Sequence, residues 1–254
     1  MVIGPMDPDE WLPIYRRILR EFDYSPEADE HAARELAKII AKRKPRPGLR
    51  ALRRIMSGRS VVVSGGAIDR RRARQISGSD LVDDPSAKLV CAGDSCRHFL
   101  QSDTVPDVVV TDLDGDLEAQ VEASRRGALL VVHAHGDNRE LLPVVGRLRG
   151  PVMGTCQCAP PRHLVNPGGF TDGDRAVILA LESGAREVIL EGFDFSRPRP
   201  RSGTKRAKLM WAGRIISQAD DGRVVWPAAS RDPRLGRPVR PSGRILTRAS
   251  RRRA

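Results

Sequence analysis

The sequence predicts a doubly wound α/β protein with a mostly parallel sheet and an N-terminal helical extension. Three observations lead to this class. Short β-branched runs recur from residue 60 onward, longer amphipathic stretches separate them, and polar residues directly follow the runs. Alternating strands and helices specify a parallel sheet that is covered on both faces. With 254 residues, 40% of them hydrophobic, the chain can fill such a core.

The first 58 residues are predicted to form a separate helical segment. Apolar residues recur there at helical spacing in two stretches: Trp11, Ile14, Ile18 and Leu19, then Ala33, Leu36, Ala37 and Ile40. Pro45 and Pro47 interrupt the pattern. The N-terminus carries acidic residues where a signal peptide would be basic and then apolar, and no stretch approaches the roughly 20 apolar residues of a membrane helix. We therefore expect a cytoplasmic protein with no membrane partner.

Residues 59–220 are predicted to form the catalytic α/β domain. Its strands are expected at 61–63, 89–91, 108–110, 129–132 and 188–190, each buried on both faces. Its helices are expected at about 116–126, 137–148 and 172–183, with a short amphipathic stretch at about 204–219. In such a sheet ligands bind beyond the carboxyl ends of the strands, so functional residues should directly follow the apolar runs.

The last segment, 221–254, is predicted to be a basic and flexible tail. Residues 197–254 hold 17 Lys and Arg against three Asp, whereas residues 1–196 hold 27 basic and 29 acidic residues. The net charge of +12 therefore comes from the C-terminal part, and it raises an RNA-binding protein as an alternative. Because this part has few aromatic residues beyond Trp211 and Trp226, base stacking is poorly supported, and nucleic acid is not expected as a partner.

The four cysteines do not predict a structural zinc site. Their spacings, C-x4-C for Cys91 and Cys96 and C-x-C for Cys156 and Cys158, differ from the C-x2-C pairs of common zinc sites. We expect four buried thiols in a reducing compartment.

The acidic turn from Thr111 to Asp116 is the clearest candidate site. Asp112 and Asp114 are two residues apart, so in extended chain both carboxylates point to one side and can share a hard cation. Magnesium suits such oxygen ligands. A calcium loop is excluded because Leu117 stands at the position that this loop needs as glycine. Helix capping explains Asp116 but neither of the other two carboxylates.

Polar residues also follow the other predicted strands. They are Ser64-Gly65-Gly66, Gly93-Asp94-Ser95 and the run from His133 to Asn138. Polar groups at several strand ends on one edge are hard to explain by surface solvation alone. The run His133-x-His135-x-Asp137 also begins the ligand pattern of binuclear zinc hydrolases, but Asn138 replaces the final histidine. A zinc hydrolase therefore stays as an alternative that metal analysis would decide.

The segment from Asn166 to Arg175 opens a predicted helix. Thr171 and Asp174 make a capping box, which is a sufficient reason for both residues. The box leaves Asn166, the glycine pair 168–169 and Asp172 unexplained, and these would give a tight loop with free amides and a carboxylate that faces the site. A structural and a functional role both stay open for this segment.

Five segments closely resemble the archaeal 6-hydroxymethyl-7,8-dihydropterin pyrophosphokinases, the MptE-like family. The segments are 106–116, 133–138, 154–157, 166–175 and 191–195. The match spans roughly 60–220, it includes 204–209, and the strings DLDGD, HAHGDN and GGFTDGDRA are specific to it. The family is similar to thiamin pyrophosphokinases in its α/β core, so the resemblance implies the same class of fold. The Ser64-Gly65-Gly66 turn and Ser95 depart from the family pattern.

The resemblance implies an enzyme that transfers diphosphate from ATP to a pterin alcohol, with Mg²⁺ as cofactor and AMP as second product, in tetrahydromethanopterin or folate-type coenzyme synthesis. It implies catalytic roles for Asp112, Asp114 and Asp137, which with Asp94 would be the metal ligands. The expected nucleotide contacts are Ser64, Gly65, Gly66, Asp94, His135, Asn138 and Lys205. The expected substrate contacts are Gln157, Asn166, Gly168, Gly169, Thr171, Asp172 and Asp174.

Three points stay open. Arg175, Lys205 and Lys208 either balance the polyphosphate or are surface charges. Thiamin is the alternative acceptor, which only turnover separates from the pterin. The oligomeric state, a homodimer included, does not follow from the sequence.

Overall fold

The computed structural model describes residues 8–78, 84–195 and 203–227, and in them eight parallel strands form one sheet in the order β6-β5-β4-β3-β2-β1-β7-β8. The strands are β1 (Ser60–Ser64), β2 (Lys88–Ala92), β3 (Val108–Thr111), β4 (Leu129–Ala134), β5 (Val152–Cys156), β6 (Leu164–Val165), β7 (Glu187–Glu191) and β8 (Val224–Val225). Each of the five predicted strands lies inside an observed one. The doubly wound α/β class is therefore confirmed.

The strands β5, β6 and β8 were not predicted from the sequence. Strand β5 has Gly154 in its centre, which weakens the β-branched pattern, and β6 and β8 are two residues each, too short for periodicity to show. Strand β8 lies within the segment that we assigned to the flexible tail. The rest of that segment, 228–254, lies outside the described residues.

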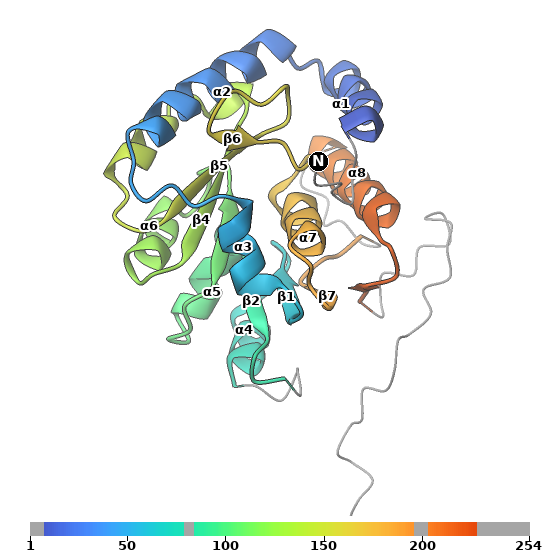
Figure 1. Ribbon diagram of the computed structural model, residues 1–254. Helices are drawn as coiled ribbons and strands as arrows, with labels where there is room; N and C mark the ends of the chain where they lie inside the picture. The colour runs from blue at the N-terminus through green and yellow to red at the C-terminus, as the bar shows by residue number, and fades with distance from the viewer. Residues whose placement is uncertain (1–7, 79–83, 196–202, 228–254) are drawn as a thin grey trace, which may run out of the picture.

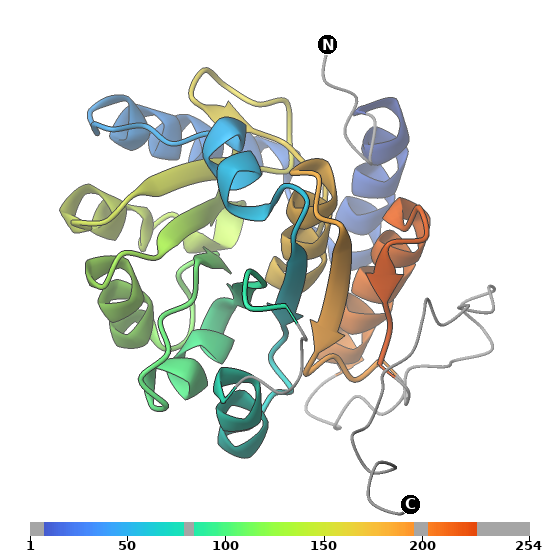
Figure 2. The same cartoon turned by 60° about the horizontal axis from the view of Figure 1, so that its bottom comes forward.

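The helices lie on both faces of the sheet (Figures 1 and 2). They are α1 (Pro8–Phe22), α2 (Pro26–Ala41), α3 (Leu49–Met56), α4 (Arg70–Ser77), α5 (Cys96–Leu100), α6 (Leu117–Arg125), α7 (Asp172–Glu182) and α8 (Gly203–Ala219). The chain steps from β1 to β4 in one direction, so right-handed crossovers place α4, α5 and α6 on one face. It then returns to the other side of β1 at β7, which places α7 on the opposite face.

The helix predicted at 137–148 is wrong. The structure has two 3₁₀ turns there, Gly136–Asn138 and Leu142–Arg147. Pro143 lacks an N–H and disfavours the helical backbone of the residue before it, so an α-helix cannot continue through this position. The predicted helices at 116–126, 172–183 and 204–219 correspond to α6, α7 and α8, with ends that differ by one residue.

The core centres on α7, which packs on β1, β2 and β3 and is buried from Asp174 to Leu181. All residues of β1, β3 and β4 are buried, as predicted for strands covered on both faces. Strand β7 instead alternates between buried and half-buried residues. All four cysteines are buried and free, as expected.

The N-terminal helices are fastened to the sheet through one buried carboxylate, Asp29 on α2. Its oxygens accept hydrogen bonds from Tyr15 Oη at 2.7 Å, from the backbone N–H of Gly136 at 2.8 Å and from Gln157 Nε2 at 2.8 Å. Trp11 Nε1 donates to the carbonyl of Gln157 at 2.9 Å. These bonds tie α1 and α2 to two loops at the carboxyl edge of the sheet, where ligands bind in this fold class.

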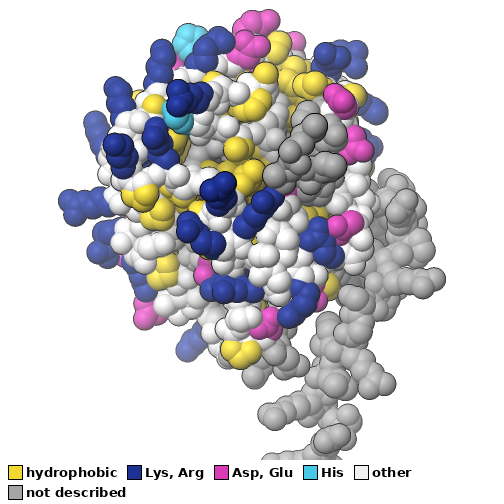
Figure 3. All heavy atoms as spheres, viewed as in Figure 1, with side chains coloured by type: hydrophobic (Ala, Val, Ile, Leu, Met, Phe, Trp, Pro, Cys, Tyr) yellow, Lys and Arg dark blue, Asp and Glu magenta, His cyan; other side chains and the backbone are white. Residues whose placement is uncertain are grey.

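Charges of both signs are interspersed on the face of the molecule that Figure 3 shows, with hydrophobic side chains exposed between them. In the described ranges, each helix is either too short or too polar to span a lipid bilayer.

We expect Asp29→Ala to lower the free energy of unfolding by roughly 3 kcal/mol, because it leaves buried donors without their acceptor and each such loss costs about 1–3 kcal/mol. Urea denaturation measures this. Glu30→Ala is the matched control: Glu30 pairs with Arg34 on the exposed side of the same helix, and its loss should cost less than about 0.5 kcal/mol. Equal losses for the two variants would contradict the role given to Asp29.

Candidate active site at the carboxyl edge of the sheet

Three carboxylates meet at the carboxyl edge of the sheet: Asp112 and Asp114, which follow β3, and Asp172, which begins α7. One oxygen of each lies within 4.8 Å of the others. Within the described residues, this carboxylate cluster is the one group of His, Cys, Asp or Glu side chains arranged to hold a metal ion. Three hard oxygen donors suit Mg²⁺.

The two aspartates after β3 converge through a turn, whereas we expected an extended chain there. Leu113 and Gly115 both have left-handed backbones, with φ of 71° and 74°. The backbone N–H of Asp114 donates to Asp112 Oδ1 at 3.2 Å. A left-handed backbone costs a non-glycine residue about 1–2 kcal/mol, and strain of this kind clusters at functional sites.

A buried hydrogen-bond chain holds this turn. The hydroxyl of Thr111 accepts from the N–H of Leu113 and donates to Gln120 Oε1, both at 2.8 Å. Gln120 Nε2 then donates to the carbonyl of Asp114 at 2.9 Å. Asp116 caps α6 by accepting from the N–H of Ala119 at 3.0 Å, as predicted for it.

Asp94, after β2, braces the same turn. Its carboxylate accepts from the N–H of Asp116 at 2.5 Å, and a Cβ at Gly115 would collide with it. Asp94 is thus close to the carboxylate cluster without belonging to it. Its predicted roles in metal and nucleotide binding stay predictions.

His135 orients Asp112. The N–H of Asp137 donates to His135 Nδ1 at 3.3 Å, so Nε2 carries the proton and donates to Asp112 Oδ2 at 3.2 Å. Burial opposes the charge of Asp112, but the bonds from His135 and from Asp114 keep its pKa below the ordinary range. Asp137 itself is exposed and lies outside the carboxylate cluster. Its metal and catalytic roles stay predictions.

Asn138, expected at the nucleotide, is used inside the protein. Both protons of its Nδ2 are donated to backbone carbonyls, those of Asp112 and His133, each at 2.7 Å. Its Oδ1 accepts from the N–H of His135 at 3.1 Å. These bonds assign Asn138 to joining the ends of β3 and β4.

Arg175, on α7, lies beneath the carboxylate cluster with no exposed surface. Its Nη2 donates to the carbonyl of Gly169 at 2.6 Å and to His133 Nε2 at 3.1 Å. Burial, aided by the charge of Arg175, lowers the pKa of His133 well below its usual range, so the imidazole is neutral. His133 Nδ1 then donates to Thr155 Oγ1 at 3.2 Å. With both ring nitrogens used, His133 is not free to bind zinc, and Arg175 is not a surface charge.

The start of α7 is built by the predicted capping box. Asp174 accepts from the N–H of Phe170 at 2.7 Å and from that of Thr171 at 2.6 Å. Gly169 has φ of 91°, and a Cβ there would lie 2.8 Å from the Cα of Arg175, so only glycine allows this close approach.

The other predicted substrate contacts mostly hold the same loop. Asn166 Nδ2 donates to the carbonyls of Gln157 at 3.1 Å and Cys158 at 2.9 Å, and Asn166 Oδ1 accepts from the N–H of Gly168 at 2.9 Å. Of the seven residues expected at the substrate, Asp172 alone joins the carboxylate cluster. Its position beside the capping box, at a helix N-terminus, was the sequence feature that pointed to a second role.

The predicted nucleotide turn after β1 packs against β7. The N–H of Gly65 donates to the carbonyl of Glu191 at 2.8 Å, and the carbonyl of Ser64 accepts from Ser95 Oγ at 3.0 Å. Gly66 is exposed on this turn, and Lys205 is exposed in the first turn of α8. Their nucleotide contacts stay predictions.

The carboxylates of the cluster repel one another, and burial also opposes their charges. Burial, a hydrogen bond with Asp112 and the charges of Asp112 and Asp94 together raise the pKa of Asp114 to about 6. Burial, followed by the charge of Asp112, raises the pKa of Asp172 well above its usual range. Carboxylates in this state lose their protons readily to solvent when a cation binds, so the residues present fit a bound divalent metal.

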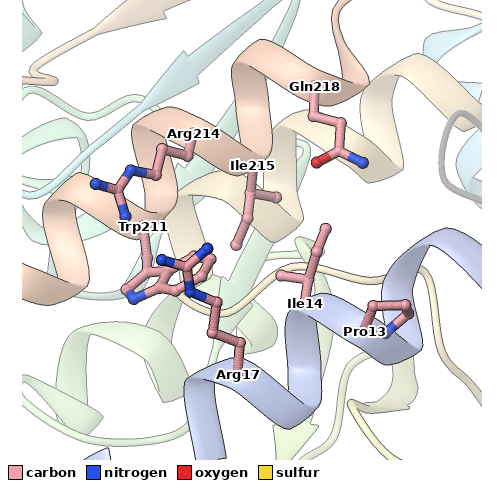
Figure 4. A pocket seen from close by; sticks show the side chains of 7 residues that line it. All are labelled: Pro13, Ile14, Arg17, Trp211, Arg214, Ile215 and Gln218. Carbon is pink, nitrogen blue, oxygen red and sulfur yellow. The ribbon is translucent and has the colours of Figure 1, made fainter. Parts of the chain in front are cut away.

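One cavity lies between the helices α1 and α8, and another lies beside the candidate active site. A cavity of about 480 Å³ between α1 and α8 is lined by Arg17, Trp211, Arg214, Gln218 and three apolar side chains, without a carboxylate (Figure 4). A small cavity of about 30 Å³ lies at the carboxyl edge of the sheet. Its lining includes Tyr24, Asp29, His135, Asp137 and Gln157. Only the small cavity touches residues of the candidate active site.

Comparisons with known proteins show which family this chain resembles. The model of the family "6-hydroxymethylpterin diphosphokinase MptE-like" matches residues 81–199. A 6-hydroxymethyl-7,8-dihydropterin pyrophosphokinase from Pyrococcus furiosus is 42% identical over 189 residues, which cover 74% of this chain and 78% of that protein. Proteins of the same name from Methanocaldococcus jannaschii and Methanothermobacter thermautotrophicus are each 36% identical, over 85% and 83% of this chain and 97% and 94% of their own lengths.

Asp114→Asn should stabilise the metal-free protein at pH 7.5. The pKa of Asp114 is about 6 in the fold against about 3.9 in an unfolded chain, so its contribution to stability is complete below pH 4 and is lost as the pH rises through 6. The gain from the substitution should therefore be present at pH 7.5 and vanish near pH 4. Urea denaturation at both pH values measures it, with the exposed Asp23→Asn as control. A gain that is independent of pH would contradict the electrostatic cause.

Proposed function

The chain belongs to the MptE-like family of 6-hydroxymethylpterin diphosphokinases, and from this premise we propose that it transfers diphosphate to the hydroxymethyl oxygen of 6-hydroxymethyl-7,8-dihydropterin. The donor in this proposal is ATP, and AMP is the second product. The observation that carries it is the carboxylate cluster of Asp112, Asp114 and Asp172 at the ligand-binding edge of the sheet. The pterin diphosphate would enter tetrahydromethanopterin or folate-type coenzyme synthesis.

In the proposed reaction the hydroxymethyl oxygen forms a bond to the β-phosphorus and releases its proton to solvent. The bond from the β-phosphorus to the oxygen that bridges it to the α-phosphorus breaks, and AMP leaves with this oxygen. Positioning and charge neutralisation supply most of the acceleration in such transfers. Mg²⁺ held by Asp112, Asp114 and Asp172 would supply positive charge to the phosphate oxygens.

The chain's own residues prepare this site. His135 and Asn138 fix the position of Asp112 through its side chain and its carbonyl. Arg175 offsets the negative charge of the cluster from inside the protein. Because these groups are held by internal hydrogen bonds, they need little reorganisation when a ligand binds.

The proposed function is tested by incubating the protein with ATP, Mg²⁺ and the dihydropterin, with thiamin in a parallel reaction. We expect AMP and the pterin diphosphate in the first reaction and neither AMP nor thiamin diphosphate in the second. AMP with thiamin alone would move the proposal to that acceptor, and no AMP with either would reject it.

Asp112→Asn and Asp172→Asn should each lower kcat/KM by at least about 10²-fold, because each removes a charged ligand from the cluster, and such groups are worth about 10²–10³ in rate. Steady-state AMP release measures the effect, and circular dichroism checks that the fold persists. Asp103→Asn, on an exposed aspartate paired with Arg126, is the control and should retain wild-type activity. Full activity in either cluster variant would refute the site.

Mg²⁺ should also raise the melting temperature of the wild-type protein. A ligand that binds only the native state stabilises it by about 2.7 kcal/mol at 100 times its Kd. The shift should be lost in Asp114→Asn, because that variant lacks one of the three carboxylates that would bind the metal. An equal shift in both proteins would place the metal elsewhere.

A further inference from the structure

Three half-buried aromatic side chains lie together at the edge of the candidate active site: Phe22, Tyr24 and Phe170. Their ring centroids are 5.6 Å apart for Phe22 and Tyr24, 5.1 Å for Phe22 and Phe170, and 6.4 Å for Tyr24 and Phe170. The chain has only three Trp, two Tyr and five Phe, so this group gathers an unusual share of them. Nothing in the sequence pattern indicated it, because Phe170 lies far from Phe22 and Tyr24 in the chain.

Two observations place the rings near the carboxylate cluster. Phe170 precedes Asp172 by two residues, and its N–H is bound by Asp174 in the capping box, so its backbone is fixed. Tyr24 lines the small cavity of about 30 Å³ together with His135, the residue that donates to Asp112. The group therefore lies beside the place where the transferred phosphate would be held.

Lys208 of α8 covers two of these rings. Its Nζ lies 5.6 Å from the centroid of Tyr24 and 5.7 Å from that of Phe170. Among the described residues no carboxylate pairs with it. An ammonium whose contacts are ring faces is free to turn toward a stronger acceptor when one arrives.

The polar side chains expected at the acceptor are already committed. Asn166 and Asp174 hold the loop before α7, and Gln157 donates to Asp29. A flat heterocycle also needs flat apolar surface, which these polar groups do not supply.

We propose that Tyr24 and Phe170 stack on the bicyclic ring of the acceptor and that Lys208 donates a hydrogen bond to an oxygen or nitrogen at the edge of this ring. This inference rests on the proposed function. It favours the acceptor over adenine because the ring of a hydroxymethylpterin is one carbon from the attacking oxygen, so it must lie beside the cluster. Adenine is separated from the β-phosphorus by a ribose and a phosphate.

Ring-removing and ring-retaining variants test the stacking. Tyr24→Leu and Phe170→Leu should each raise KM for the dihydropterin about tenfold, equivalent to about 1.4 kcal/mol, because stacking on one aromatic face is worth this much. Tyr24→Phe and Phe170→Tyr keep the ring and should stay within twofold of wild type. KM for ATP should not change in any of the four, and their melting temperatures show whether each variant folds.

Lys208→Met tests the hydrogen bond, with Arg214→Met as matched control. Arg214 is on the same helix and also covers a ring, with its Cζ 5.4 Å from the centroid of Trp211, but that ring lines the larger cavity (Figure 4). Lys208→Met should raise KM for the dihydropterin about tenfold, and Arg214→Met should leave it unchanged.

The outcomes separate this inference from the reaction on which it rests. Quenching of dihydropterin fluorescence measures ring binding without ATP or metal. Wild-type turnover with an unchanged KM in the Leu variants would overturn the stacking and leave the reaction intact. Quenching in the wild type that the Leu variants lose, without release of AMP, would support the stacking and overturn the reaction. Neither quenching nor turnover in the wild type would overturn both.

Discussion

The buried guanidinium of Arg175 sets the constraint on which the candidate site depends. A charge with no exposed surface is costly unless hydrogen bonds and opposite charges compensate it. Here the carbonyl of Gly169 and the neutral ring of His133 accept hydrogen bonds from its Nη2, and the carboxylates of Asp174 and Asp172 favour its charged form. Both Asp172 and Arg175 lie in the first turn of α7, so a single helix end contributes negative charge to the cluster and positive charge beneath it.

The other carboxylates of the candidate site lie where the start of α7 meets the carboxyl ends of the strands. Because all strands are parallel, the loops after β2, β3 and β4 open on one side of the sheet, where α7 begins. The carboxylates that meet there repel one another, and this repulsion adds to burial in raising the pKa of Asp114. Internal bonds from His135, Gln120 and Asn138 hold the turn against this repulsion, so the protein retains an arrangement that a cation completes.

The N-terminal helices belong to this arrangement and are more than an extension. Asp29 binds the backbone of Gly136 and the side chain of Gln157, and Tyr24, next to α2, contributes a ring at the carboxyl edge of the sheet. The strand order accounts for their placement, since α7 covers β1 to β3 and leaves β4 and β5 open to α2. Segments that are distant in sequence therefore share one active-site border.

The sequence by itself determined the sheet class, five of its strands, the helices that open after the acidic turn and after the capping box, and the pairing of Asp112 with Asp114. Each of these depends on local patterns: apolar runs, capping residues and spacing within a few residues. The strands β5, β6 and β8 were missed because a central glycine or a length of two residues removes such a pattern.

Only the tertiary structure decided which polar residues face the site and which are used inside the protein. Asp172 joined the carboxylate cluster, whereas Asn138, Asn166 and Asp174 were used to hold loops. Local sequence cannot separate these cases, because a hydrogen-bond partner supplied by another strand end or helix is invisible in the segment itself. The same reason hid Asp29 and the group of Tyr24, Phe170 and Lys208. The members of this group meet only when the loop between α1 and α2, the loop before α7 and helix α8 pack together.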